Sequence, residues 1–160
     1  MSSTTEQATF QLAGKTPVST SMLPMVMYDS VNSVITVEVM VAQAPKVNSI
    51  TISVPPVTIP TGKWEVKWEL MVSTPGLEAG FAEPGIKLGV LPSGVTLTAG
   101  PSGSKILWTA WFTNVVKTVD SLDYEIDIAS TSGVGLHKAK SVTRRDTTIV
   151  VVKDPKDPPG

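Results

Sequence analysis

The chain has 160 residues, with 13 Lys and Arg against 14 Asp and Glu, no cysteine and one histidine. This length suits one domain, and a formal net charge of −1 excludes the global positive charge that holds proteins on nucleic acid or anionic lipid. Without cysteine, the chain has no disulfide, no thiol nucleophile and no blue-copper ligand set. We therefore expect no cofactor, no metal, no nucleic acid and no membrane as partner.

The two ends of the chain are polar. Residues 1–11 lack the cationic start and apolar core of a secretory signal, which predicts a cytoplasmic location. A short strand is expected over Ala8–Leu12. We expect one domain over residues 1–152, of which 1–7 are flexible, and a proline-rich charged tail over residues 153–160.

Methionines are concentrated in the next segment. Met22, Met25 and Met27 have a spacing that could suit a soft ion such as Cu(I), with Met40 as a fourth sulfur. The segment between these residues is apolar, whereas copper-handling segments are usually polar around their methionines. We favour adaptable packing in a core strand.

Strands with alternating side chains follow. In Lys63–Leu70, every second residue is apolar and the residues between are Lys or Glu, which puts four apolar side chains on one face of a strand. Ile50–Val54 alternates in the same way, and Val34–Val41 is β-branched with one strongly apolar face. Trp64 and Trp68 are predicted to lie in the core.

The second half of the chain repeats this pattern. Strands are predicted over Lys87–Leu91, Val95–Thr98, Ile106–Phe112, Leu122–Ile128 and Thr148–Val152, separated by clusters of Gly, Pro and Ser. Eight or nine short strands with these spacings predict an all-β fold: a single-domain antiparallel β-sandwich of Greek-key type.

The order of segments from Ile50 onward carries a resemblance. An alternating strand, a Pro-Pro break, Gly62, two Trp-bearing strands around a Pro- and Gly-rich middle, a Leu-Asp-Tyr strand and a closing Arg-Asp-Thr-Thr-Ile-Val-Val follow one another. This order resembles small bacterial single-domain β-sandwich proteins of cupredoxin-like or immunoglobulin-like build. Tyr124 also looks like a tyrosine corner, bonded back to the preceding turn. The resemblance implies a fold and no active site, because cupredoxins need Cys and two His whereas His137 stands alone.

Few residues of the sequence suggest catalysis, metal binding or anion binding. His137 lies in a glycine-rich turn beside cations and is interpreted as a solvated loop residue. Asp123, Glu125 and Asp127 share one strand face, which formally suits a carboxylate pair or a hard cation, but a solvated face that discourages edge pairing is favoured. The Arg-Arg-Asp run at 144–146 could clamp an anion, and a rim ion pair is favoured. No enzyme activity is expected.

Trp111 is the one aromatic residue whose predicted position suggests a function. The parity of its strand points Trp111 and Leu107 outward, where the indole could stack on a sugar, cap a small ligand, be buried against another subunit or lie under a loop. Our leading hypothesis is a non-enzymatic binding or assembly module that self-associates through outer faces bearing Trp111, Leu107, Val34 and Met40. The alternative is a module for carbohydrate or another small ligand that uses Trp111, and a third is an enzyme with a dispersed site. A polar pocket around Trp111 would favour the ligand module, and a flat apolar patch would favour assembly.

Overall fold

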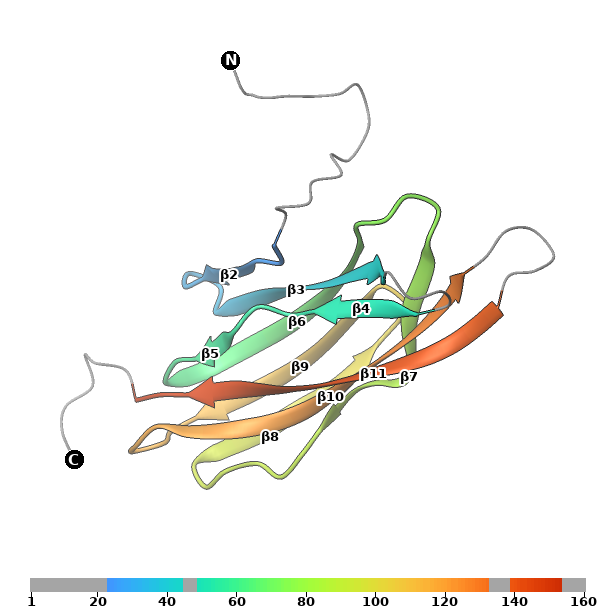
Figure 1. Ribbon diagram of the computed structural model, residues 1–160. Helices are drawn as coiled ribbons and strands as arrows, with labels where there is room; N and C mark the ends of the chain where they lie inside the picture. Colours follow the sequence, from blue (N-terminus) through green and yellow to red (C-terminus); the bar gives the residue numbers. More distant parts are fainter. Residues whose placement is uncertain (1–22, 45–48, 133–138, 154–160) are drawn as a thin grey trace, which may run out of the picture.

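The computed structural model describes residues 23–44, 49–132 and 139–153, and these form strands without any helix. In chain order the strands are β2 (Val26–Asp29), β3 (Val34–Gln43), β4 (Ile50–Ser53), β5 (Val57–Ile59), β6 (Gly62–Val72), β7 (Glu78–Leu88), β8 (Val95–Gly103), β9 (Leu107–Asn114), β10 (Asp120–Ser132) and β11 (Ala139–Val151) (Figure 1). The predicted all-β fold is therefore confirmed. Within the described part of the chain, no helix is present that could cross a membrane.

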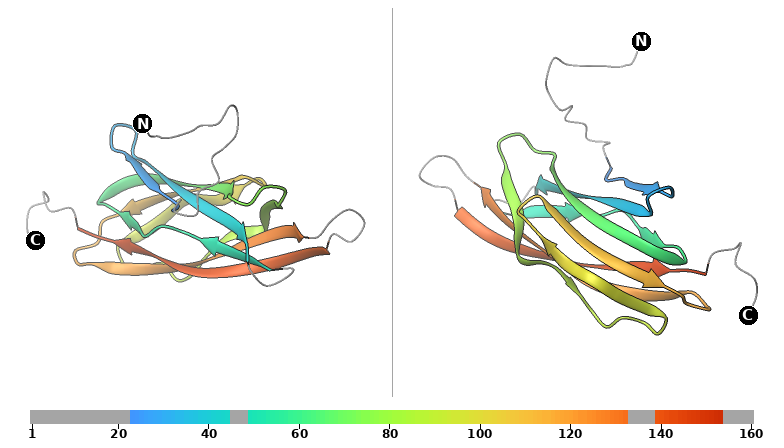
Figure 2. Two further views of the ribbon diagram at one scale, coloured as in Figure 1. Left: turned by 45° about the horizontal axis from the view of Figure 1, so that its top comes forward. Right: turned by 180° about the vertical axis from the view of Figure 1, so that it is seen from behind.

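The strands form two sheets that lie face to face (Figure 2). One sheet has the order β2-β3-β6-β9-β8, with β4 paired to β3 beyond the end of β2. The other has the order β5-β11-β10-β7. Most neighbours are antiparallel, but β3 pairs with β6 and β5 pairs with β11 in parallel, so both sheets are mixed rather than purely antiparallel.

The core between the sheets follows the alternation of the sequence. Inward residues of β3, β6, β9, β10 and β11 are buried, whereas the Lys and Glu residues of β6 lie on the outer face. Trp68 is fully buried, and its Nε1 donates a hydrogen bond to the Tyr124 hydroxyl across the core (3.1 Å). Trp64 is only partly buried at the margin of this core. This bond crosses between the sheets rather than returning to the preceding turn, so the tyrosine-corner interpretation is wrong.

Two polar side chains fasten the side of the sandwich where β5 lies. The buried Asn114 at the end of β9 donates from Nδ2 to the carbonyls of Ile59 (2.9 Å), Pro60 (3.1 Å) and Val152 (3.1 Å). The Tyr28 hydroxyl accepts from the N–H of Thr58 (3.0 Å) and donates to the carbonyl of the same residue (2.8 Å). Asn114 of β9 and Tyr28 of β2 therefore join the six-stranded sheet to β5 of the other sheet.

Strand β7 departs most from the prediction. The sequence predicted Lys87–Leu91, but the strand runs from Glu78 to Leu88. Its pairing with β10 is interrupted by a bulge, where Gly85 has φ +60° and lies against the indole of Trp108. A Cβ at Gly85 would overlap the Trp108 ring, so this position requires glycine. Gly and Pro at the bulge erase the period of two that strand prediction relies on.

Other differences have similar causes. The described chain holds ten strands rather than eight or nine. The short strand β5 was not predicted, and β2 was expected only as a core strand of the methionine segment, outside that count. Strand β11 begins well before the predicted Thr148, where polar and charged residues hide the alternation. The expected strand at Ala8–Leu12, residues 1–7, which were expected to be flexible, and most of the tail lie outside the described residues, and so does His137.

Candidate binding site

Trp111 lies on the outer face of the six-stranded sheet, as its parity predicts. It occupies the middle of β9, where Glu65 of β6 is its partner on one side and Ala99 of β8 on the other. The residue is 37% exposed. Because Ala99 is small, the indole is not covered from the β8 side.

The indole borders a shallow hollow of about 320 Å³. The hollow forms where the turn between β2 and β3 meets the start of β6 and the middle of β8 and β9. Trp111 is the outward-facing aromatic residue of its lining, whereas Trp64 and Phe112 belong to the inward faces of their strands. The lining also offers amide, hydroxyl, ammonium and carboxylate groups, and its residues are Asn32, Ser33, Lys63, Trp64, Glu65, Thr98, Trp111 and Phe112.

The turn that supplies one wall is held in place by Asp29. Its Oδ1 accepts from the N–H groups of Val31 and Asn32 (3.1 Å each), and its Oδ2 accepts from the Asn32 Nδ2 (2.9 Å). The side-chain bond from Asn32, followed by the backbone bonds, lowers the pKa of the Asp29 carboxyl below its ordinary value. The next residue, Ser33, has φ +56°, and its carbonyl accepts from the Glu65 N–H (2.9 Å). The turn is therefore fixed against β6 before any ligand binds.

The opposite wall is fixed as well. Thr98 on β8 donates from Oγ1 to the Trp111 carbonyl (3.0 Å), which ties the edge strand to the backbone under the indole. Both walls are therefore preorganised, and a preorganised site loses less conformational entropy when it binds.

The charges of the hollow balance. Lys63 and Glu65 are its only charged lining residues, and they carry opposite signs. With Asn32 and Thr98, they offer hydrogen-bond donors and acceptors around an aromatic face. An uncharged ligand with an apolar face and several hydroxyl groups matches this arrangement.

Leu107 lies on the same outer face as Trp111 but in charged surroundings. It is half-buried and opposite Glu69, while Thr109 between the two residues is opposite Lys67. Because β6 and β9 are neighbours, the charged face of β6 and the Trp111 face are one surface. Met40 also adds no apolar area to it, since this residue is only 6% exposed. Trp111 therefore does not lie in a flat apolar patch.

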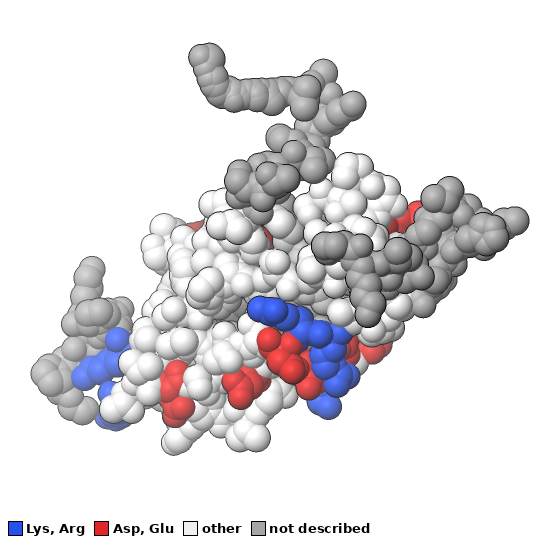
Figure 3. All heavy atoms as spheres, viewed as in Figure 1, with Lys and Arg blue, Asp and Glu red and all other residues white. Residues whose placement is uncertain are grey.

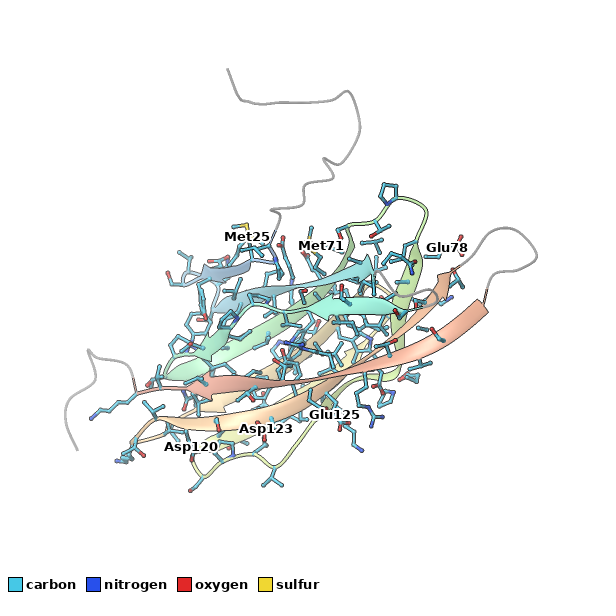
Figure 4. The ribbon with its side chains drawn as sticks, viewed as in Figure 1. Met25, Met71, Glu78, Asp120, Asp123 and Glu125 are labelled. Carbon is cyan, nitrogen blue, oxygen red and sulfur yellow. The ribbon has the colours of Figure 1, made fainter. Side chains whose placement is uncertain are left out.

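A second hollow, of about 540 Å³, lies on the outer face of the four-stranded sheet. Figure 4 shows Asp123 and Glu125 pointing from β10 to this side, away from Met25 and Met71. The Asp123 carboxylate accepts from the Thr148 hydroxyl (2.9 Å), and Arg144 lies 3.7 Å from Glu125. In the space-filling view, acidic and basic groups gather here on an otherwise weakly charged face (Figure 3).

The expectation of a solvated carboxylate row is only partly right. Asp127 is 5% exposed, because it is paired with the guanidinium of Arg144, whose Nε donates to Oδ1 (2.9 Å). Arg144 therefore pairs across the sheet instead of with the adjacent Asp146. Among the described residues, no group of three or more His, Cys, Asp or Glu is placed to hold a metal ion.

The methionine segment is not a core strand. Met25 is 58% exposed, and Met27 on β2 is also exposed, so the interpretation as core packing is wrong for both. Strand β2 lies at the border of its sheet, where outward side chains meet solvent. Met22 lies outside the described residues.

Sequence reasoning found Trp111 but missed the residues around it. The signal for the turn was present, because Asp and Asn within the run Asp29-Ser30-Val31-Asn32-Ser33 are typical turn residues. What the sequence did not reveal is that this turn and Thr98 lie beside Trp111. No protein-family model matches the sequence, and no curated protein shows significant similarity to it.

Proposed function

We propose that the protein is a non-catalytic binding domain that recognises an uncharged, sugar-like ligand at the Trp111 hollow. The observation that carries the proposal is a partly exposed indole among polar groups of balanced charge, on walls fixed by hydrogen bonds. A pyranose ring has an apolar C–H face that can stack on an indole, and hydroxyl groups that both donate and accept. The hollow offers partners for each of these features.

A catalytic role is not favoured for this hollow. Glu65 is its only carboxylate, and it contains no histidine. Glycoside hydrolysis needs two carboxyl groups in defined positions. Assembly through the Trp111 face is likewise less favoured, since Lys and Glu of β6 share that face.

The test is a titration of tryptophan fluorescence with four uncharged hexasaccharides: cellohexaose, maltohexaose, xylohexaose and chitohexaose. We expect at least one of them to saturate the signal below about millimolar concentration, as weak sugar sites do. Trp111→Ala should abolish the saturation. Leu107→Ala, a truncation on the same strand and face, should leave it unchanged.

A second variant tests the fixed turn. Asp29→Ala removes the carboxylate that orders Asn32 and should weaken binding without altering the β-rich circular dichroism spectrum. Saturation that survives in Trp111→Ala, or no response to any of the four sugars, would refute the proposed site.

A further inference from the structure

Strand β11 has a long unpaired edge. On one side it pairs with β10 over its whole length. On the other side β5 pairs only with Ile149, Val150 and Val151, because the chain preceding β5 carries Pro55-Pro56 and crosses to the other sheet (Figure 1). No described strand pairs with β11 before Ile149 on this side.

The backbone groups at this edge can be identified by alternation. The N–H of Val152 donates to the Ile59 carbonyl (3.2 Å), so the even-numbered residues of this strand point their N–H and C=O groups toward the β5 side. Before Ile149, the residues with this orientation are Val142, Arg144, Asp146 and Thr148, and no described strand accepts their groups. An edge of this kind is a template for another strand.

Charges of both signs lie along this edge. Arg144 is opposite Asp127 on β10 and bonded to it. Asp146 is opposite Glu125, so two carboxylates face each other across the ladder. Like charges in directly opposed positions are unfavourable. Within the sheet, Glu125 is opposite Lys87 on β7 and lies 3.7 Å from Arg144. A cation of another chain on the open side of Asp146 would attract this carboxylate in addition.

We propose that this edge binds the same edge of a second copy of the chain, antiparallel, with a two-fold axis at Arg145. Arg144 of each copy then lies opposite Asp146 of the other, and Val142 lies opposite Thr148. Each Asp146 then lies opposite a cation of the other copy. The two four-stranded sheets become one continuous sheet.

The register is specified by the charges. Moving the axis by one residue in either direction would place Arg144 against Arg144, or Asp146 against Asp146. The proposed register has two opposite-charge pairs and one like pair, Arg145 with itself. Arg145 is exposed, so its long side chain can turn into solvent.

The backbone and the adjacent hollow favour the same arrangement. The four opposed pairs from Val142 to Thr148 would form about eight backbone hydrogen bonds, two for each pair of this type. The 540 Å³ hollow has Asp146, Thr147 and Thr148 as its wall on the β11 side. The second copy would extend this wall with Arg144.

The alternative is that these charges only protect the edge from pairing, which is a common use of charged edge residues. The two accounts predict opposite results for complementary charge reversals. Asp146→Lys would face Arg144 in its own dimer, and Arg144→Glu would face Asp146. An equimolar mixture of the two variants restores both opposite-charge pairs.

The experiment is sedimentation equilibrium of the full chain at about 50 µM, where mass action favours association. We expect the mass of a dimer for the unchanged protein, at least tenfold weaker association for each charge variant alone, and recovery in the mixture. Circular dichroism checks that each variant is folded. A monomeric unchanged protein, normal association of either variant, or no recovery in a mixture of folded variants would overturn the proposal.

If Arg144→Glu does not fold because Asp127 has lost its paired cation, a backbone variant tests the proposal instead. Val142→Pro removes an N–H that points to the open edge and leaves the bonds to β10 in place. We expect this variant to be monomeric, whereas Val142→Ala, which keeps the N–H, should dimerise. Trp111→Ala should also dimerise, so loss of sugar binding and loss of dimerisation are separate outcomes.

Discussion

The hydrogen bonds of the buried Asn114 allow its contribution to the free energy of unfolding to be worked out. Its Nδ2 donates to three carbonyls, and its Oδ1 accepts from the Val116 N–H (3.0 Å). Asn114→Leu keeps the approximate volume and removes every one of these bonds. The Ile59 carbonyl retains the Val152 N–H, and the Val152 carbonyl retains the Thr61 hydroxyl at 3.5 Å.

Two groups therefore lose the bond described for them: the buried Val116 N–H and the Pro60 carbonyl. An unsatisfied buried group costs about 1–3 kcal/mol, so loss of the bond to the Val116 N–H should lower the free energy of unfolding by about this amount. The Pro60 carbonyl is only half-buried and should add a smaller loss. Equilibrium urea unfolding followed by circular dichroism measures this change. Thr113→Val, a half-buried outer-face neighbour on the same strand, should cost less than about 0.5 kcal/mol.

Asn114→Asp sharpens the test. The new carboxylate would lie against three carbonyl oxygens in a buried site, which raises its pKa and favours the neutral form. Because the folded-state pKa lies above the unfolded one, the variant should lose stability relative to the unchanged protein as the pH rises through the acidic range. An Asn114→Leu cost below about 1 kcal/mol, or an Asp variant without this pH dependence, would refute the role assigned to Asn114.

Three further predictions concern the core. Burial raises the pKa of Tyr124 from 10.0 to about 12. The stability that this shift contributes should be fully present below pH 10, and the free energy of unfolding should fall by about 3 kcal/mol as the pH rises through 12. Tyr124→Phe should abolish this alkaline loss. Gly85→Ala should destabilise the fold by more than about 2 kcal/mol in urea unfolding, since its Cβ would overlap the Trp108 indole at a positive φ. Trp68→Ala should cost about 3–5 kcal/mol and Lys67→Ala under about 0.5, and equal costs would contradict the assignment of faces.

The parts of the fold that the sequence predicted are those where one rule dominates. In Lys63–Leu70 and Leu122–Ile128, one face packs in the core and the other carries charged side chains, so the alternation of side chains is strict. Strand β7 contains a bulge, and the early part of β11 lies at an open edge. The bulge breaks the alternation of β7 although Phe81 and Ile86 are buried, and the early part of β11 is mostly exposed, so neither segment shows a regular pattern.

The candidate site illustrates the same limit. Parity within one strand was enough to place Trp111 outside. The neighbours of Trp111 depend on which strands pair, because β6 and β8 flank β9 only through the sheet order. The sequence also could not show that Glu65 and Trp111 share a face. Register, rather than composition, decides the chemistry of this surface.

The most direct measurement of the proposed function is a two-dimensional ¹H–¹⁵N spectrum of the indole N–H groups during titration with the hexasaccharide that binds best. The chain has four tryptophans, so their indole signals can be assigned one by one with Trp→Phe variants. We predict that the signal of Trp111 shifts progressively and saturates, while that of the fully buried Trp68 does not move. Unchanged Trp111 signals at saturating sugar, or shifts confined to the other tryptophans, would contradict the account.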